Sequence, residues 1–361
     1  GLFVTRIASQ YWTVTEQNTQ VYSLEGIVLW NRLIWLSIGF LALGLTYTFF
    51  KTTTPRTRSR KNKKSKGLSN FQVSQLAIPQ VSLQKGGTVN LRRILSLSQL
   101  YFKEVIKSIP FIAITLMGLI LLITNSIDLS ALYGTSTFPT TYLMLGQIQS
   151  FTLFFLIIIV FYSGELIWRE RDVRINLIYD ALPVPNYVGL VAKFLGLLQV
   201  YVVLIFTLIL TGMAIQTFNG YFKYEIGVYL GWLFTDTFIW LTLFTVLAFF
   251  IHILANQKFL GHALIVIFFI ATGVLSDFGL EHSMWQFASG SMGSFSDMNR
   301  FGHFPTKFSW YQTYWAGFAT ILFVVGALFS VRGTDTLLKT RAKLAKLRFV
   351  RPTLILASMA L

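Results

Sequence analysis

Seven stretches of this chain are apolar for long enough to cross a membrane as helices, and this constrains the fold more than any other feature. They lie at roughly 27–50, 109–125, 143–163, 188–213, 228–254, 259–279 and 312–331, and an eighth begins at Pro352. A spanning helix needs about 20 mostly apolar residues, because hydrocarbon offers no partner for an unpaired backbone amide. Only 12% of the residues are charged, against about 25% in an average soluble domain. The sequence therefore predicts an all-α polytopic membrane protein.

The basic residues lie mainly in segments that alternating spans place on one side of the membrane. Of 30 Lys and Arg, 25 fall within 51–107, 164–193, 332–351 and the turn at Lys258. Since Lys and Arg are retained on the cytoplasmic side, these loops are predicted to be cytoplasmic. The net charge of +16 is then explained by topology. Nucleic acid is not an expected partner, because no aromatic stacking set accompanies the charge.

The chain divides into four parts by composition. We expect an outer segment and the last helix of a preceding half at 1–50, a basic linker against anionic lipid headgroups at 51–90, a six-span module at 91–335, and a basic inner loop with the start of a further helix at 336–361. The chain begins with Gly1 and stops inside an apolar run, so we interpret it as an internal piece of a longer protein.

The first segment of the six-span module has the pattern of a basic amphipathic helix. In "LRRILSLSQLYFKEVIKS", residues 91–108, a helical period places Arg92, Ser96, Gln99, Lys103 and Lys107 on one face. A helix of a soluble bundle has a similar pattern. Because a span follows at once, we expect this helix to lie in the inner membrane interface before the chain turns in at Pro110.

The loop after the second span of this module is unusually rich in charges of both signs. They are Glu165, Arg169, Glu170, Arg171, Asp172, Arg174 and Asp180. Apolar residues interleave with them, which predicts an amphipathic element that "ALPVP" then ends, since proline removes a donor. The positive-inside rule accounts for Lys and Arg in a cytoplasmic loop but not for the acidic residues found here. The loop is therefore either a projection that another protein binds or a segment whose charges are only solvated at the ends of two neighbouring helices.

The interfacial helix, the six spans, the charged loop and a long outer segment before the last span together resemble the type 2 family of ABC-transporter permeases. The resemblance covers about 91–335 and includes the pattern "E…R…L…LPV…K", carried here by Glu165, Arg171, Leu182, Pro183, Val184 and Lys193. In that family the loop after the second span is a coupling helix that docks on a cytoplasmic ATPase subunit. The resemblance thus implies ATPase contacts at Glu165, Arg169, Glu170, Arg171, Asp172 and Arg174, and an extracellular re-entrant region within 281–311, which by composition equally suits an exposed loop.

A closer resemblance is to long bacterial permeases that join two six-span halves and carry a zinc aminopeptidase-like domain after the second. This chain is similar to the join and the second half. The resemblance implies an exporter in the bacterial inner membrane that pairs with a second permease half and an ATP-binding subunit. The rival hypothesis is a membrane anchor for an enzymatic domain beyond Leu361.

Catalytic chemistry is not expected within the chain itself. It has no phosphate-binding loop and no HExxH motif, so it is expected to bind no cofactor and to be no enzyme. Its four histidines lack metal-ligand spacing with a carboxylate and are interpreted as packing or interfacial residues. Asp236, at membrane depth in "LGWLFTDTFIWL", is a candidate for the substrate path or for a helix contact.

Overall fold

The computed structural model describes most of the predicted membrane module and one helix before it. The described residues are 26–49, 86–126, 131–132, 135–136, 138–274, 278–279, 282–290, 292–293, 298–333 and 337–349, with Thr13, Thr15 and Phe295. Two compact units divide the chain, Gly1–Val81 and Ser82–Leu361. Most of the predicted basic linker and the segment that begins at Pro352 lie outside the described residues.

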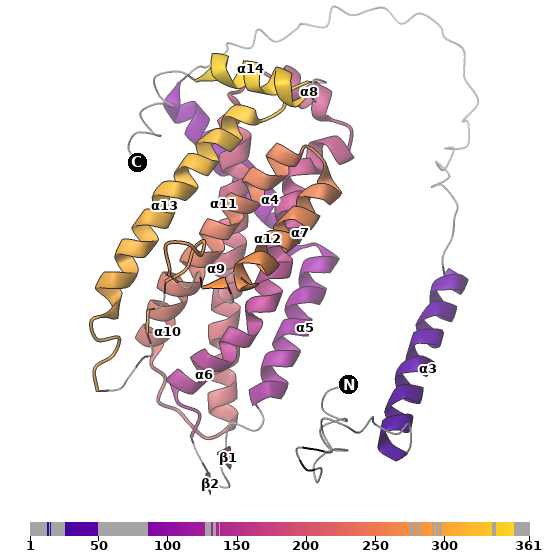
Figure 1. The fold of residues 1–361 in the computed structure, drawn as a ribbon, viewed down its shortest axis with the longest axis vertical. Helices are drawn as coiled ribbons and strands as arrows, with labels where there is room; N and C mark the ends of the chain where they lie inside the picture. The colour runs from indigo at the N-terminus through magenta and orange to yellow at the C-terminus, as the bar shows by residue number, and fades with distance from the viewer. Residues whose placement is uncertain are drawn as a thin grey trace, which may run out of the picture. The chain divides into compact units, whose positions relative to one another are not determined.

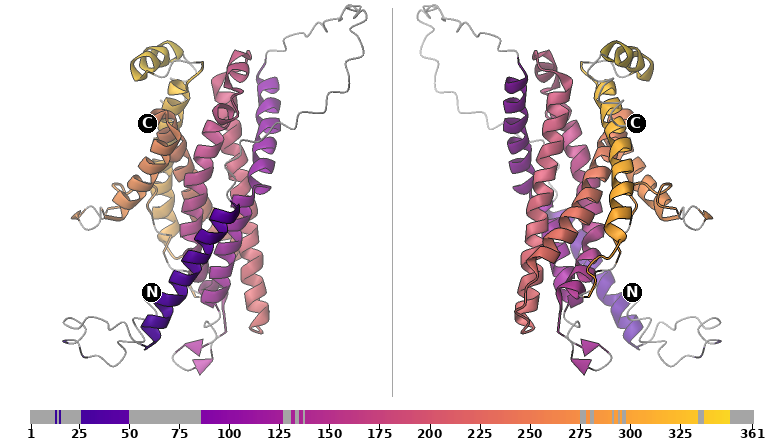
Figure 2. Two further views of the ribbon diagram at one scale, coloured as in Figure 1. Left: turned by 90° about the vertical axis from the view of Figure 1, so that its right-hand side faces the viewer. Right: turned by 90° about the vertical axis from the view of Figure 1, so that its left-hand side faces the viewer.

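The first unit contains helix α3, Gly26–Phe49, and the second contains a helical bundle (Figure 1). In chain order the second unit has α4 Gly87–Ile106, α5 Ile109–Ser126, strands β1 Ala131–Leu132 and β2 Thr135–Ser136, α6 Thr141–Ile148, the 3-10 turn η2 Gln149–Phe151, α7 Thr152–Asp172, α8 Asn176–Ala181, α9 Asn186–Phe218, α10 Ile226–Trp232, the π turn η3 Leu233–Thr237, α11 Phe238–Ala255, α12 Lys258–Val274, α13 Phe304–Phe329 and α14 Leu338–Arg348. The strands form one antiparallel pair in which Ala131 faces Ser136. We call the end of the bundle that carries α8 and α14 the α8 end, and the opposite one, with β1 and β2, the β end (Figures 1 and 2).

Six described helical segments are long and apolar enough to cross a membrane, which confirms an all-helical, membrane-embedded protein. They are Val28–Thr48, Ile109–Ser126, Thr141–Asp172, Asn186–Phe218, Ile226–Ala255 and Phe304–Phe329. The segment expected to span at 259–279 contains α12, a shorter apolar helix of 17 residues, and residues 275–277 of this segment lie outside the described residues. With 33 residues α9 is about 50 Å long, which exceeds the roughly 30 Å of hydrocarbon. It therefore extends beyond the membrane core at one end or both.

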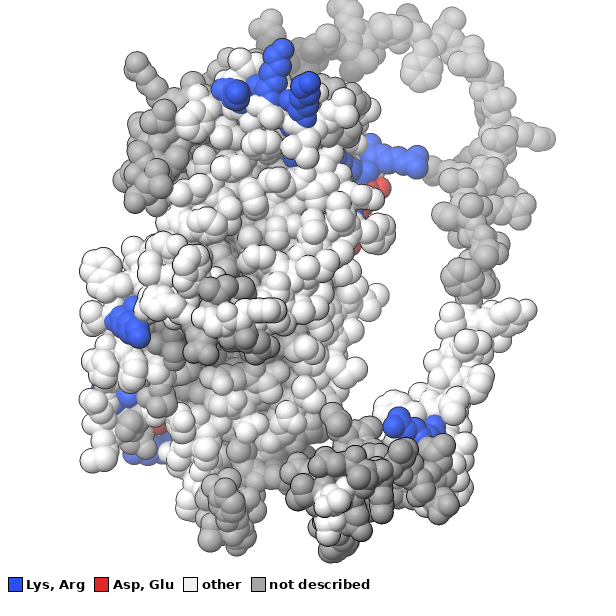
Figure 3. Space-filling view, viewed as in Figure 1, with Lys and Arg blue, Asp and Glu red and all other residues white. Residues whose placement is uncertain are grey.

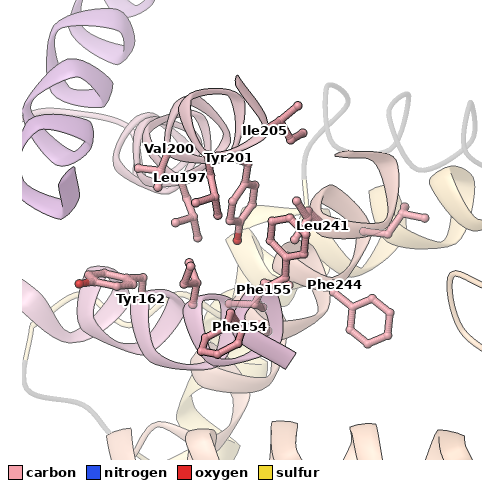
Figure 4. Close-up of a cluster of buried hydrophobic side chains, with 14 of the residues drawn as sticks. Phe154, Phe155, Tyr162, Leu197, Val200, Tyr201, Ile205, Leu241 and Phe244 are labelled. Atoms are coloured by element: carbon pink, nitrogen blue, oxygen red, sulfur yellow. The ribbon is translucent and has the colours of Figure 1, made fainter. Parts of the chain in front are cut away.

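The core of the bundle is formed where α7, α9 and α11 meet (Figure 4). Its labelled side chains are Phe154, Phe155 and Tyr162 from α7, Leu197, Val200, Tyr201 and Ile205 from α9, and Leu241 and Phe244 from α11. Two buried hydroxyls in this core satisfy each other, since those of Tyr201 and Thr245 share a hydrogen bond of 2.7 Å. Helices in lipid gain from close packing and from such bonds, because lipid tails are as apolar as the side chains they replace.

The segment between α12 and α13 packs into the bundle. Its described residues form turns, and Phe287 is buried with its ring centroid 5.4 Å from that of Phe244 on α11 and 5.2 Å from that of Trp315 on α13. The Trp315 indole also donates to the Ser283 carbonyl at 3.2 Å. Part of the predicted outer segment is thus anchored among helices, as a re-entrant region would be.

Helix α4 packs chiefly along α9, and a glycine makes the close approach possible. It buries Ile94, Ser98, Tyr101 and Val105, so its apolar stripe faces a helix. A Cβ at Gly196 would lie 2.9 Å from the Cβ of Tyr101 and 3.0 Å from the Ser98 carbonyl oxygen. Because the second contact is with backbone, α4 itself would have to move to admit any larger residue.

We expect Gly196→Leu to lower the free energy of unfolding by about 1–3 kcal/mol, as overpacking does in cores. Thermal unfolding in detergent measures the change. The matched control is Gly146→Leu on α6, where an added Cβ meets no atom within 4 Å. Equal melting temperatures for the two variants would contradict the close α4–α9 contact.

Candidate functional site

The charged loop of the sequence forms the end of α7, a short turn and α8. Helix α7 continues through the charges to Asp172 and ends where Arg174 takes a left-handed φ of 59°. The Ile175 amide then donates to the Glu170 carbonyl at 2.9 Å, which closes the helix end. Helix α8 follows and stops at Leu182, directly before Pro183.

Glu170 lies at the centre of a buried charge network that joins three helices. Its carboxylate is 2.5 Å from the Lys193 ammonium of α9, and it accepts a hydrogen bond of 2.9 Å from the Tyr101 hydroxyl of α4. The side chains of Lys193 and Glu170 are only 9% and 12% exposed. Burial and the charge of Glu170 raise the pKa of Tyr101, so the phenol stays a donor.

Arg169 extends this network to the surface of α4. Its guanidinium pairs with Glu104 and lies over the Tyr101 ring, 5.5 Å from the centroid. Burial raises the pKa of Glu104, and the charge of Arg169 opposes that rise. Helices α4 and α7 are thus held together by the Arg169–Glu104 ion pair and by the contact of Arg169 with the Tyr101 ring.

The remaining charges of α7 join it to the α11–α12 turn. The Lys258 ammonium lies 2.7 Å from both Glu165 and Asp172, which are two helical turns apart on one face of α7. Arg171 stacks on the Trp168 ring at 5.1 Å and donates to the Asn256 side chain at 3.2 Å. Asn256 ends α11 in a left-handed conformation with φ 49°.

Arg174 and the residues around it are arranged differently. Arg174 is exposed, and its side chain has no ion pair with the described residues. Its neighbours expose apolar side chains, and no residue of α8 is buried. We call the following set the apolar face of α8: Val173, Ile175, Leu177, Ile178 and Leu182, which are 45–72% exposed.

Arg332 fixes this loop to the end of α13. Its guanidinium donates to the carbonyls of Asp180, Leu182 and Val184 and to the Asn186 side chain. The next residue adds a further bond, since the Gly333 amide donates to the Asp180 carboxylate at 2.8 Å. We call these contacts the Arg332 clasp. One of these carbonyls, that of Asp180, lies in the last turn of α8, where a helix leaves its carbonyls without helical partners.

The structure therefore brings together five of the six residues predicted to contact an ATPase, but through partners inside the chain. Glu165, Arg169, Glu170, Arg171 and Asp172 each have such a partner, whereas the side chain of Arg174 has no ion pair within the part of the chain that the structure describes. Sequence reasoning missed the roles of Tyr101, Glu104 and Arg332. A basic residue directly after a span is the only signal for Arg332, and many such residues mark topology alone.

Asp236 lies elsewhere, in the π turn η3 between α10 and α11. Its carboxylate has no hydrogen bond or ion pair with the described residues, so the predicted helix contact has no polar partner there. Nearby, Trp232 lies against Phe301 with centroids 5.5 Å apart, and the Thr235 hydroxyl contacts the Met292 sulfur at 3.2 Å. Since π turns often occur at functional sites, a substrate-path role stays a prediction.

The histidines pack in pairs with aromatic neighbours. The rings of His252 and His262 meet edge to face with centroids 4.8 Å apart, and His262 Nδ1 lies 2.9 Å from the Val160 carbonyl oxygen. Among the described residues no group of three or more His, Cys, Asp or Glu is placed to hold a metal ion.

Comparison with protein-family models, with curated proteins and with solved structures gives no match to this chain.

We expect Lys193→Met to destabilise the protein by about 3–5 kcal/mol, because it leaves the Glu170 carboxylate buried without its cation. Unfolding monitored in detergent gives the loss. Adding Glu170→Gln to Lys193→Met should restore much of the stability, since a neutral amide still accepts from Tyr101. A double variant less stable than Lys193→Met would contradict the pairing.

We expect Arg332→Lys to loosen α8 without unfolding the bundle, because an ammonium does not reproduce the planar fork on three carbonyls. Hydrogen exchange of the amides in 176–184 should accelerate by about tenfold or more, the equivalent of roughly 1.4 kcal/mol. Arg92→Lys on the exposed side of α4 is the control. Unchanged exchange in Arg332→Lys would refute the clasp.

Proposed function

We propose that this chain is a permease subunit of an ATP-driven, ABC-type transporter and that α8 is its coupling element. The observation that supports this most is the apolar face of α8, which is exposed beside Arg174 while the neighbouring charges are bound internally. A contiguous exposed apolar surface with a polar rim is typical of a protein contact site. A loop that only solvates a helix mouth would expose its charges and bury its apolar residues.

The distribution of basic residues supports a cytoplasmic location for α8. Figure 3 shows Lys and Arg gathered over α14 at the α8 end of the bundle, where the positive-inside rule places the cytoplasm. In this orientation the charge network around Glu170 lies near the inner membrane surface, and α4 has its polar residues at the inner interface with lipid. The predicted outer segment then faces the other side.

The contacts of α8 provide a route for movement. A partner that pushes α8 acts on α7 and α9 through the chain, and on α13 through the Arg332 clasp. Helix α13 also contacts the turn that holds Phe287. ATP-driven closure of the partner would thus reach the predicted outer segment through one packed helix.

The other expectations complete the proposal. The ATPase is a separate cytoplasmic subunit, the second permease half is in the same polypeptide or in a second copy, and catalysis lies outside this chain. The bacterial inner membrane and outward transport are proposed from the resemblance alone. The anchor hypothesis predicts instead that α8 contacts no ATPase.

The test is affinity isolation of the full-length protein in mild detergent with mass spectrometry for an ATPase that carries the phosphate-loop motif. We expect recovery of this partner to fall by about tenfold or more in Leu177→Asp/Ile178→Asp, since two buried apolar side chains contribute roughly 1.5–3 kcal/mol each. Phe222→Asp is the matched control, because Phe222 is equally exposed in the α9–α10 turn. Absence of an ATPase from the wild type would favour the anchor hypothesis, and its retention by the double variant would exclude α8 as the contact.

A further inference from the structure

A cavity of about 140 Å³ with both polar and apolar lining residues lies at the α8 end, between α7, α8, α9, α11 and the residues after α13. This volume holds several water molecules or one tetrahedral oxyanion. Its lining includes Trp168, Arg171, Lys193, His252 and Arg332. It is distinct from the apolar face of α8, because no residue of that face lines the cavity.

One buried donor in the lining lacks a partner, since the Trp168 Nε1 atom has no hydrogen bond with the described residues. The His252 ring does not serve as a second, because its Nδ1 atom lies against Gly261 of α12, which does not line the cavity. Leaving one such group unsatisfied costs about 1–3 kcal/mol, so buried donors normally face water or a ligand.

The charges of the lining favour an anion. Glu170 is neutralised by Lys193 and bound by Tyr101, and Asp180 accepts from the Gly333 amide. Arg171 carries five N–H donors, of which one is used on Asn256. Arg332 uses four of its five N–H donors in its clasp. Arg171 is therefore the arginine of the lining with the most free donors, and it is held in place by its stacking on Trp168.

We propose that this cavity binds a phosphate group through the Arg171 guanidinium and the Trp168 N–H. A guanidinium fork matches two phosphate oxygens, and the indole N–H donates to a third. The phosphate is either a free anion or the headgroup of an anionic phospholipid, since basic pockets at the cytoplasmic ends of membrane helices bind such headgroups. Because Asn176 and Tyr179 of α8 also line the cavity, an occupied site braces α8 against α7 and α9. The site does not depend on the transport proposal.

The experiment is thermal unfolding of the full chain in phosphatidylcholine nanodiscs. One arm adds inorganic phosphate, with chloride at equal ionic strength as the reference, and the other dopes the nanodiscs with phosphatidic acid. A ligand of the folded state raises the melting temperature with concentration. A rise in both arms identifies the phosphate group itself, a rise only with phosphatidic acid identifies a lipid headgroup, and no rise in either arm overturns the proposal.

The variants locate the site. Arg171→Gln should raise the half-saturating concentration by about tenfold or more, since a hydrogen bond to a charged group contributes roughly 1.5–3 kcal/mol. Trp168→Phe keeps the ring beneath Arg171 and removes only the N–H, so it tests the site even if Arg171→Gln does not fold. Arg93→Gln on α4, outside the cavity lining, should bind as the wild type does. Wild-type binding by both Arg171→Gln and Trp168→Phe would also overturn the proposal.

Discussion

The pair of Glu170 and Lys193 is the contact on which the α8 end of the bundle depends. A buried ion pair adds little net stability, yet removing one member is costly because the other charge is then left without a partner. Because of this asymmetry the pair fixes how α7 and α9 are aligned along their lengths: a shift of one helix past the other would separate the two charges. The hydrogen bond from Tyr101 to Glu170 fixes the position of α4 in the same way. The end of α7, and with it the position of α8, follows from this alignment.

Arginines at the same end satisfy the backbone where helices stop. The last carbonyls of a helix have no partner within it and carry the negative end of its dipole. Arg341 of α14 donates to the Ile253 and Leu254 carbonyls at the end of α11, at 2.5 and 3.2 Å, and Arg348 donates to the Ser330 carbonyl after α13 at 2.8 Å. The Arg332 clasp does the same for α8. The basic bias of this end therefore has a structural use in addition to its value as a topology signal.

The membrane-spanning helices could be predicted from sequence, because the free energy of transfer into hydrocarbon depends on local composition. The six long apolar helical segments of the structure follow that composition. The pairs could not be predicted, since Lys193 lies 23 residues from Glu170 and Arg332 lies 152 residues from Asp180. Sequence reasoning found the charged loop and interpreted its charges as contacts for another protein. In the folded chain Arg169, Glu170 and Arg171 have partners in the bundle, and the apolar face of α8 is exposed, so their contact with an ATPase stays a prediction. A helical period identifies two faces of a short segment, but only tertiary contacts decide which one is covered.

The attachments of α8 determine what a force on it would do. It is joined to α7 and α9 by short connections, and the Arg332 clasp adds α13, a helix of 26 residues and about 39 Å. Trp315, in the first half of α13, packs against the Phe287 ring and donates to the Ser283 carbonyl. Helix α13 therefore connects the α8 end of the bundle with the turns that precede α13 in the chain. A packed helix moves as a unit because its core contacts are not continuously deformable. In the proposed transporter, a shift of α8 would therefore move α13 as a lever, and Arg332 is the residue at which that lever is attached.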